Sequence, residues 1–213
     1  MKRWVLTLSF VICHLFFSHI VAQTFVSVPV PDSVFQRMQG RSWPVGCSVN
    51  RSDLRYLRLS HYDAAGKVHT GEMVCNKAIA QDLITIFQEL YRQKYPIQQI
   101  RLIDDYDADD ERSMRANNSS SFCYRQVSGT KKLSKHAMGM AVDINTLYNP
   151  YVHKGRDGRQ VVEPATAWRY VDRTKSFPYK ITRDDLLCRL FRKYGFRWGG
   201  DWRTMKDWQH FEK

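Results

Sequence analysis

The stretch "SKHAMGMAVDIN", residues 134–145, joins His136 to Asp143 across Gly139 and runs into an apolar, β-branched segment. If "MAVDIN" is a strand, side chains alternate, so Asp143 faces a cleft while its two apolar neighbours face the core. A fully extended chain would place His136 up to about 23 Å from Asp143, at about 3.3 Å per residue. Gly139 is the cheapest place for the chain to fold back, because glycine accepts backbone angles that a side chain forbids. We therefore expect His136 and Asp143 to lie at one site.

A histidine and a carboxylate at one point suit a divalent metal, but a catalytic zinc usually has three protein ligands and an open position for water. The C-terminal stretch "DWQHFEK" supplies a third candidate, His210, with Asp207 three residues before it. In a straight strand these two side chains would point to opposite faces, whereas a turn that enters a strand lets both reach one site. The glycines of "WGGDW", residues 198–202, permit such a loop. We predict that His136, Asp143 and His210 bind one Zn²⁺ per chain.

Asp207 is the predicted general base beside the water that zinc activates, and it later hands the proton to the leaving amine. Zinc lowers the pKa of its water toward ~7, so a nearby carboxylate completes the activation near neutral pH. Two alternatives stay open. One is a zinc-stabilised binding module without catalysis, against which the presence of Asp207 argues. The other is a basic surface-binding protein in which His136 and His210 are core histidines.

The first 22 residues have the pattern of a secretory signal peptide. Lys2 and Arg3 precede the apolar run "WVLTLSFVICHLFF", and Ala22 is a plausible cleavage site. The alternative is an uncleaved anchor, although this run is shorter than the ~20 residues that a spanning helix needs. Either interpretation predicts an exported protein, secreted or periplasmic, that contacts the membrane only through this segment.

The chain is basic, and this limits its partners. Its 213 residues carry a formal net charge of +12, and removal of residues 1–22 takes away Lys2 and Arg3 and leaves +10. Such an excess favours acidic partners. The basic residues are scattered and form neither an arm nor an aromatic-interleaved stripe, so nucleic acid is not expected. An anionic cell-wall polymer or membrane surface suits an exported chain better, and a merely soluble basic surface is the alternative.

The cysteines do not follow a metal-binding pattern. The chain without residues 1–22 has four, and an even number in an oxidising compartment indicates one or two disulfides, with free buried thiols as the alternative. Spacing does not choose among the possible pairings of these residues: Cys47, Cys75, Cys123 and Cys188.

Hydrophobic periodicity predicts an α+β domain. Residues 23–44 are interpreted as an extended arm with a short helix near "DSVFQRM", and residues 45–213 as the main domain, with 43% hydrophobic residues in the whole chain. The main domain is predicted to begin with a hairpin of strands 54–62 and 67–75 and a helix over 77–94 that ends before Pro96. A strand at 97–103, an acidic loop at 104–112 and a strand at 140–145 are predicted to follow. The C-terminal helix is predicted to begin with a Thr182–Asp185 capping box and to end at Gly195.

The motifs resemble a known family. "SKHAMGMAVDIN" matches the Ser-x-His-x-x-Gly-x-Ala-x-Asp signature of the zinc D-alanyl-D-alanine carboxypeptidases and L-alanyl-D-glutamate endopeptidases that act on bacterial cell-wall peptides. "WGGDWRTMKDWQHFEK" resembles the branch of that family that uses Asp-x-x-His. The likeness covers roughly residues 45–213 and includes "NNSSSFCYR".

The resemblance implies a hedgehog/D,D-peptidase-like fold, an antiparallel sheet with flanking helices and a zinc cleft. It implies zinc ligands at His136, Asp143 and His210, and catalysis by Asp207. Arg125 falls where the family places an arginine that polarises the scissile carbonyl or steadies the oxyanion, with an ordinary salt bridge to the acidic loop as the alternative. Ser134 matches a position that contacts substrate or orients the site.

The expected function is therefore that of a zinc metallopeptidase that hydrolyses amide bonds in peptidoglycan stem peptides. The sequence does not choose between carboxypeptidase and endopeptidase action. We expect a monomer whose partners are peptidoglycan peptides.

Overall fold

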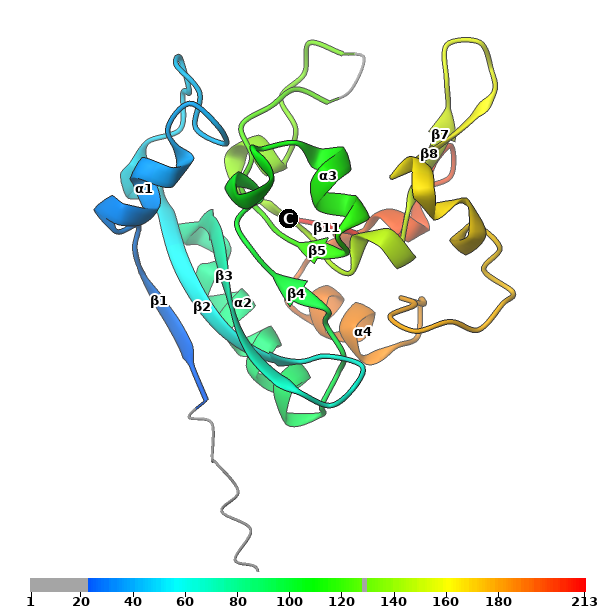
Figure 1. Cartoon of the computed structure of the whole chain (residues 1–213), viewed down its shortest axis with the longest axis horizontal. Coiled ribbons are helices and arrows are strands. Elements are labelled where there is room, and N and C mark those ends of the chain that lie inside the picture. Colours follow the sequence, from blue (N-terminus) through cyan, green and yellow to red (C-terminus); the bar gives the residue numbers. More distant parts are fainter. Residues whose placement is uncertain (1–22, 128–129) are drawn as a thin grey trace, which may run out of the picture.

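The computed structural model describes residues 23–127 and 130–213, so the predicted signal peptide lies outside the described residues. In the described residues the strands form three antiparallel sheets of three strands each and one parallel pair, with few helices between them (Figure 1). This agrees with a mixed α and β domain built on antiparallel sheets. The more specific hedgehog/D,D-peptidase fold stays a prediction.

The first sheet has the order β1-β2-β3 and carries the longest helix on its inner face. The elements are β1 (Phe25–Pro29), β2 (Leu54–Tyr62), β3 (Val68–Asn76) and α2 (Lys77–Arg92). The predicted hairpin and helix are confirmed. Asn76 begins α2, because its side chain accepts a hydrogen bond from the backbone N–H of Ala78 at 3.0 Å.

The segment 23–44, expected from the sequence as an extended arm, contributes one strand to this sheet. β1 pairs with β2 along its whole length, and the predicted short helix is present as α1 (Asp32–Met38). Backbone pairing with β2 holds β1, and α1 is held by burial of apolar side chains that polar neighbours obscure in the sequence. The buried set comprises Val30, Val34, Met38, Val49, Leu54, Tyr56, Val74, Leu102 and Phe122.

The middle of the chain is less regular than predicted. The strand expected at 97–103 is only β4 (Gln99–Ile100), which pairs in parallel with β5 (Asn118–Ser119). The expected acidic loop at 104–112 runs into a short helix, α3 (Asp110–Arg115), which Asp109 caps by accepting from the N–H of Arg112 at 3.0 Å.

Two small sheets contain the C-terminal motifs. The sheet with the order β6-β11-β9 has β6 (Ala141–Asp143), β11 (His210–Glu212) and β9 (Arg197–Trp198). The sheet with the order β10-β7-β8 has β10 (Lys206–Asp207), β7 (Tyr151–Lys154) and β8 (Gln160–Glu163).

The C-terminal helix is α4 (Leu186–Lys193), and Gly195 at φ +83° follows its end as predicted. Its N-cap is Asp185 and not Thr182, because the Asp185 carboxylate accepts from the N–H of Cys188 at 2.9 Å. The same carboxylate also accepts from the N–H of Thr182 at 3.2 Å, so the two predicted residues do interact.

The main core lies between α2, α4 and the sheets. Val142, Ile144 and Phe211 are fully buried in it, and they fix β6 and β11 from behind. None of the helices within the described ranges has the length and apolar character needed to cross a bilayer.

The disulfides expected from the sequence are absent from the described part of the chain, where Cys47, Cys75, Cys123 and Cys188 are free thiols. Cys75 and Cys188 fill space in the apolar core. Burial raises the pKa of Cys123 to about 12, so this thiol stays neutral.

Candidate metal centre

His136 is held at the start of a tight turn. The 3₁₀ turn His136–Met138 begins where the hydroxyl of Ser134 accepts from the N–H of His136 at 3.2 Å. Gly139 follows at φ +65°, and its carbonyl accepts from the N–H of Asn76 at 2.9 Å. The chain folds back at Gly139, as the sequence predicted, and His136 thereby faces the end of β6.

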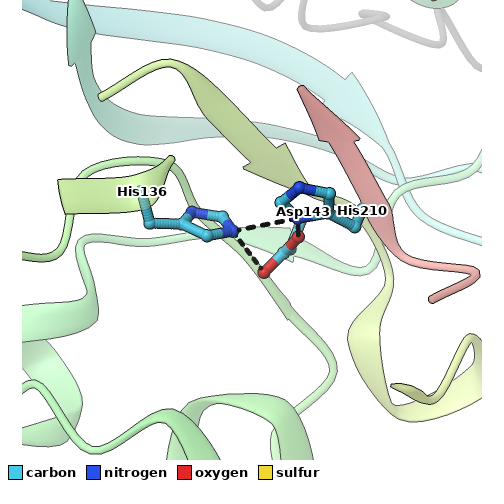
Figure 2. A group of neighbouring side chains, drawn as sticks. All are labelled: His136, Asp143 and His210. Carbon is cyan, nitrogen blue, oxygen red and sulfur yellow. Dashed lines mark hydrogen bonds and ion pairs between the residues drawn. The ribbon is translucent and has the colours of Figure 1, made fainter. Parts of the chain in front are cut away.

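Asp143 and His210 lie directly opposite each other on β6 and β11. The Nδ1 atom of His210 lies 3.0 Å from one carboxylate oxygen of Asp143, and the Nε2 atom of His136 lies 3.0 Å from the other (Figure 2). The two imidazole nitrogens are 3.2 Å apart. Three side chains from distant parts of the chain thus converge on one point.

The geometry fits a tetrahedral metal. With zinc–ligand bonds of about 2.0–2.1 Å, adjacent ligands at a tetrahedral centre lie about 3.3 Å apart. The three contacts among His136, Asp143 and His210 are within a few tenths of an ångström of that value, and one ligand atom from each comes within 4.8 Å of the others. These residues therefore form a possible His–Asp–His metal site.

The charge balance of the group also fits a cation. Burial disfavours the cationic form of His210, but hydrogen bonds to Asp143 and Glu212 outweigh it and raise the pKa of His210 to about 10. Burial would raise the pKa of Asp143, yet the two imidazoles hold it well below its usual range. The buried carboxylate of Asp143 thus stays ionised beside the protonated His210, and a metal ion bound here would take the place of that proton.

Asp207 lies in the same cleft. Burial raises its pKa to about 7, against the lowering effect of His210, while the negative charges of Asp143 and Glu163 raise it further. Its buried Oδ1 atom has no hydrogen-bond partner among the described residues. Gly199 lets the backbone approach here, because a Cβ atom at this position would come 2.5 Å from the Asp207 carbonyl oxygen. The glycine predicted to permit this loop is required by it.

Arg125 and Ser134 also line the cleft, which has a volume of about 350 Å³. Arg125 forms an ion pair with Asp110 of α3, which is the salt bridge to the acidic segment considered as the alternative. Arg125 also lines the cleft, so this ion pair does not remove it from the site. Burial would lower the pKa of Arg125, but the charge of Asp110 raises it, so the guanidinium remains a fixed cation.

Sequence reasoning missed several cleft residues. They come from α3, from the hairpin of β7 and β8, from β9 and the turn after it, and from β11: Asp110, Tyr151, Glu163, Arg197, Trp202 and Glu212. Only Glu212 carried a usable signal, because it follows His210 by two residues and strand alternation places both on one face. The others are brought in by loops whose course the sequence does not reveal.

The C-terminal part of the chain also matches a known family. Residues 128–213 match the family model Peptidase_M15_4, described as D-alanyl-D-alanine carboxypeptidase. The match supports the M15 peptidase family and a peptidase activity, and M15 peptidases are typically metal-dependent. The matched segment contains the His–Asp–His group, Asp207 and Ser134, but not Arg125. No curated protein and no solved structure matches the chain.

Proposed function

We propose that this protein is a zinc metallopeptidase that hydrolyses amide bonds in peptidoglycan stem peptides. The single observation that carries the proposal is the convergence of His136, Asp143 and His210 in one cleft with Asp207. The match of residues 128–213 to the carboxypeptidase model supports the same reaction class.

Two imidazoles and one carboxylate form a donor set that suits zinc, with a fourth position left for water. One Zn²⁺ per chain would be held by the Nε2 atom of His136, the Nδ1 atom of His210 and a carboxylate oxygen of Asp143. When bound, zinc supplies a lowered pKa for its water and polarises the substrate carbonyl.

Asp207 moves the proton. It takes the proton of the attacking water and delivers it to the amine that leaves, which requires a carboxyl whose pKa lies near the working pH. Burial brings the pKa of Asp207 to about 7 in the chain alone. Its unpartnered Oδ1 atom is free to accept that proton.

Arg125 stabilises the negative charge that develops on the carbonyl oxygen. A partly buried guanidinium that lines a cleft acts in a lower dielectric than bulk water, where a fixed charge is worth more. Asp110 holds the guanidinium in place through their ion pair. Ser134 holds the backbone of His136 and lines the cleft, where its hydroxyl can contact the peptide.

The setting of the reaction follows from the N-terminal pattern and the charge. A signal segment at residues 1–22 would export a chain of net charge +10, which suits an anionic cell wall. We propose a secreted or periplasmic monomer that acts on stem peptides as a D-Ala-D-Ala carboxypeptidase or an L-Ala-D-Glu endopeptidase.

The test combines metal analysis with product masses from defined stem peptides. We expect one zinc per wild-type chain and cleavage of an amide bond, and product masses distinguish the two bond types. Asp207→Ala should bind zinc normally and lose roughly 10²–10⁴-fold in rate, as expected when a general base is removed. Asp32→Ala, which removes an exposed carboxylate of α1, is the matched control and should cleave at the wild-type rate.

Two results would contradict the proposal. If Asp207→Ala bound zinc and cleaved as fast as wild type, the assigned mechanism would be wrong. If the wild-type chain bound zinc but cleaved no stem peptide, the chain would be a zinc-stabilised binding module instead.

A further inference from the structure

Glu212 lies on the same face of β11 as His210. The strand alternates His210, Phe211 and Glu212, and Phe211 is fully buried in the core behind. The Nε2 atom of His210 lies 3.4 Å from the Oε2 atom of Glu212. The side chain of Glu212 is only 14% exposed, so this contact is shielded from water.

The contact decides which nitrogen of His210 faces the metal site. A neutral imidazole carries one proton, and the nitrogen that donates it cannot bind a metal. If the Nε2–H group donates to Glu212, the lone pair remains on Nδ1, which is the atom that faces Asp143 and His136.

His136 uses the opposite nitrogen for the same purpose. Its Nδ1 atom lies 2.7 Å from the backbone carbonyl of Ser121 and donates to it, which leaves Nε2 for the site. The two histidines therefore need different acceptors, a fixed carbonyl for one and a carboxylate for the other. Because a carboxylate side chain can rotate, Glu212 can orient the imidazole ring of His210 only if another residue holds Glu212 in place.

Arg197 fixes that carboxylate. It lies directly opposite Glu212 on β9, and one of its terminal nitrogens donates to the Oε1 atom of Glu212 at 2.6 Å. Each carboxylate oxygen thus has one partner, Arg197 on Oε1 and His210 on Oε2. A carboxylate accepts from both, whereas an amide in its place can accept on its oxygen only.

We propose that Glu212 is a positioning residue that, held by Arg197, keeps His210 in the orientation and tautomer that present Nδ1 to zinc. The inference rests on the proposed zinc site and assigns a role to residues outside the ligand set. Groups that accept the second N–H of a metal-bound histidine typically contribute 10–100-fold to metal affinity.

The experiment measures zinc dissociation constants by competition with a chelator. We expect Glu212→Gln to weaken zinc binding by roughly 10–100-fold, because the amide turns its NH₂ group toward His210 when Arg197 holds its oxygen. Glu89→Gln, which alters a carboxylate held by Arg92 on α2, is the matched control and should bind zinc as wild type does.

The Arg197→Ala substitution makes the test sharper. Combined with Glu212→Gln, it frees the amide oxygen to accept from His210, so zinc affinity should rise relative to Glu212→Gln alone. Alone, it should lower affinity slightly, because Glu212 loses its anchor. This rescue of zinc affinity in the double variant is a signature that a merely structural role of Glu212 would not produce.

The outcomes are separable. Wild-type zinc affinity in Glu212→Gln, or the same effect of Arg197→Ala in both backgrounds, overturns the positioning role and leaves the zinc peptidase intact. A wild-type chain that binds no zinc overturns both proposals.

Discussion

Gly139 is the residue on which the approach of His136 to Asp143 depends. Its φ of +65° lies in the left-handed region, and a Cβ atom there would come 2.7 Å from the backbone nitrogen of Asn76. Both the conformation and the close packing therefore require glycine. Gly46 has a similar φ of +83°, but a Cβ atom there would have no neighbour within 4 Å, so at Gly46 only the backbone conformation favours glycine.

The comparison of Gly139 with Gly46 predicts how much unfolding free energy is lost when each glycine is replaced by alanine. Gly46→Ala should cost about 1–2 kcal/mol of unfolding free energy, the strain of a left-handed alanine. Gly139→Ala should cost about 1–3 kcal/mol more, because backbone atoms of β3 must also move. Denaturant unfolding of the metal-free proteins measures both values. Equal losses would mean that the packing of Gly139 against β3 is unimportant.

At the scale of elements, some parts of the chain can be predicted from the local sequence pattern, whereas others depend on contacts between residues far apart in the sequence. β2, β3 and α2 are predictable because their apolar periodicity is carried by consecutive residues and a proline stops the run. The turn that brings His136 toward Asp143 is predictable for the same reason, since both residues and Gly139 lie within eight positions. The sequence also indicated His210 and Asp207 as partners, through the short Asp-x-x-His spacing.

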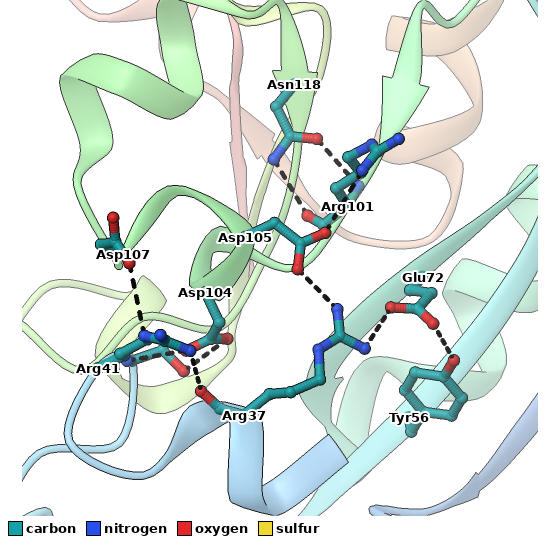
Figure 3. Close-up of polar contacts among 10 residues, drawn as sticks. Arg37, Arg41, Tyr56, Glu72, Arg101, Asp104, Asp105, Asp107 and Asn118 are labelled. Carbon is teal, nitrogen blue, oxygen red and sulfur yellow. Dashed lines mark hydrogen bonds and ion pairs between the residues drawn. The ribbon is translucent and has the colours of Figure 1, made fainter. Parts of the chain in front are cut away.

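The structure of the acidic segment 104–112 could not be predicted from the local sequence pattern. Its sequence is typical of a solvated loop, yet basic and hydroxyl side chains of the N-terminal segment form ion pairs and hydrogen bonds with it (Figure 3). Arg37 binds both Asp105 and Glu72 at 2.8 Å, and buried Asp104 accepts from the backbone and hydroxyl of Ser42. These partners lie more than 60 residues apart in sequence, except for Glu72. No local pattern reports them, and the position of Asp110 in the cleft depends on this segment.

The hairpin of β2 and β3 contains a buried histidine that makes stability depend on pH. Burial lowers the pKa of His61 to about 4 from its ordinary value of 6.5, while the neighbouring carbonyl of Leu59 and the charge of Asp63 raise it and His69 lowers it. As pH falls through 6.5 the unfolded chain binds the proton first, so stability is full above 6.5 and is lost down to about pH 4. The loss from this group is about 3 kcal/mol.

A His61→Gln substitution removes this titration. We expect the free energy of unfolding of the variant to fall by about 3 kcal/mol less than that of wild type between pH 6.5 and 4. Denaturant unfolding of the metal-free proteins across this range gives the difference directly. Parallel pH profiles of the two proteins would show that His61 is protonated as readily in the fold as in the unfolded chain.

At the scale of the whole molecule, the candidate metal centre joins segments that are far apart in the chain. Asp143 and His210 are 67 positions apart, and the strands that carry them meet only in the β6-β11-β9 sheet. The three ligand side chains come together only when β6 and β11 pair and the turn at Gly139 forms. The unfolded chain offers no such group, so zinc should bind the folded state far more tightly.

Zinc should therefore stabilise the protein by mass action. With free zinc at about 100 times its dissociation constant, linkage adds about 2.7 kcal/mol, which corresponds to a rise of roughly 5–10 °C in Tm for a chain of this size. Calorimetry of the chelator-treated protein, with zinc and with magnesium added back, measures the rise. We expect it with zinc only, because magnesium prefers octahedral oxygen ligands. His210→Ala should lose the zinc-dependent rise; the same rise in that variant would place the stabilising zinc elsewhere and contradict the assigned ligand set.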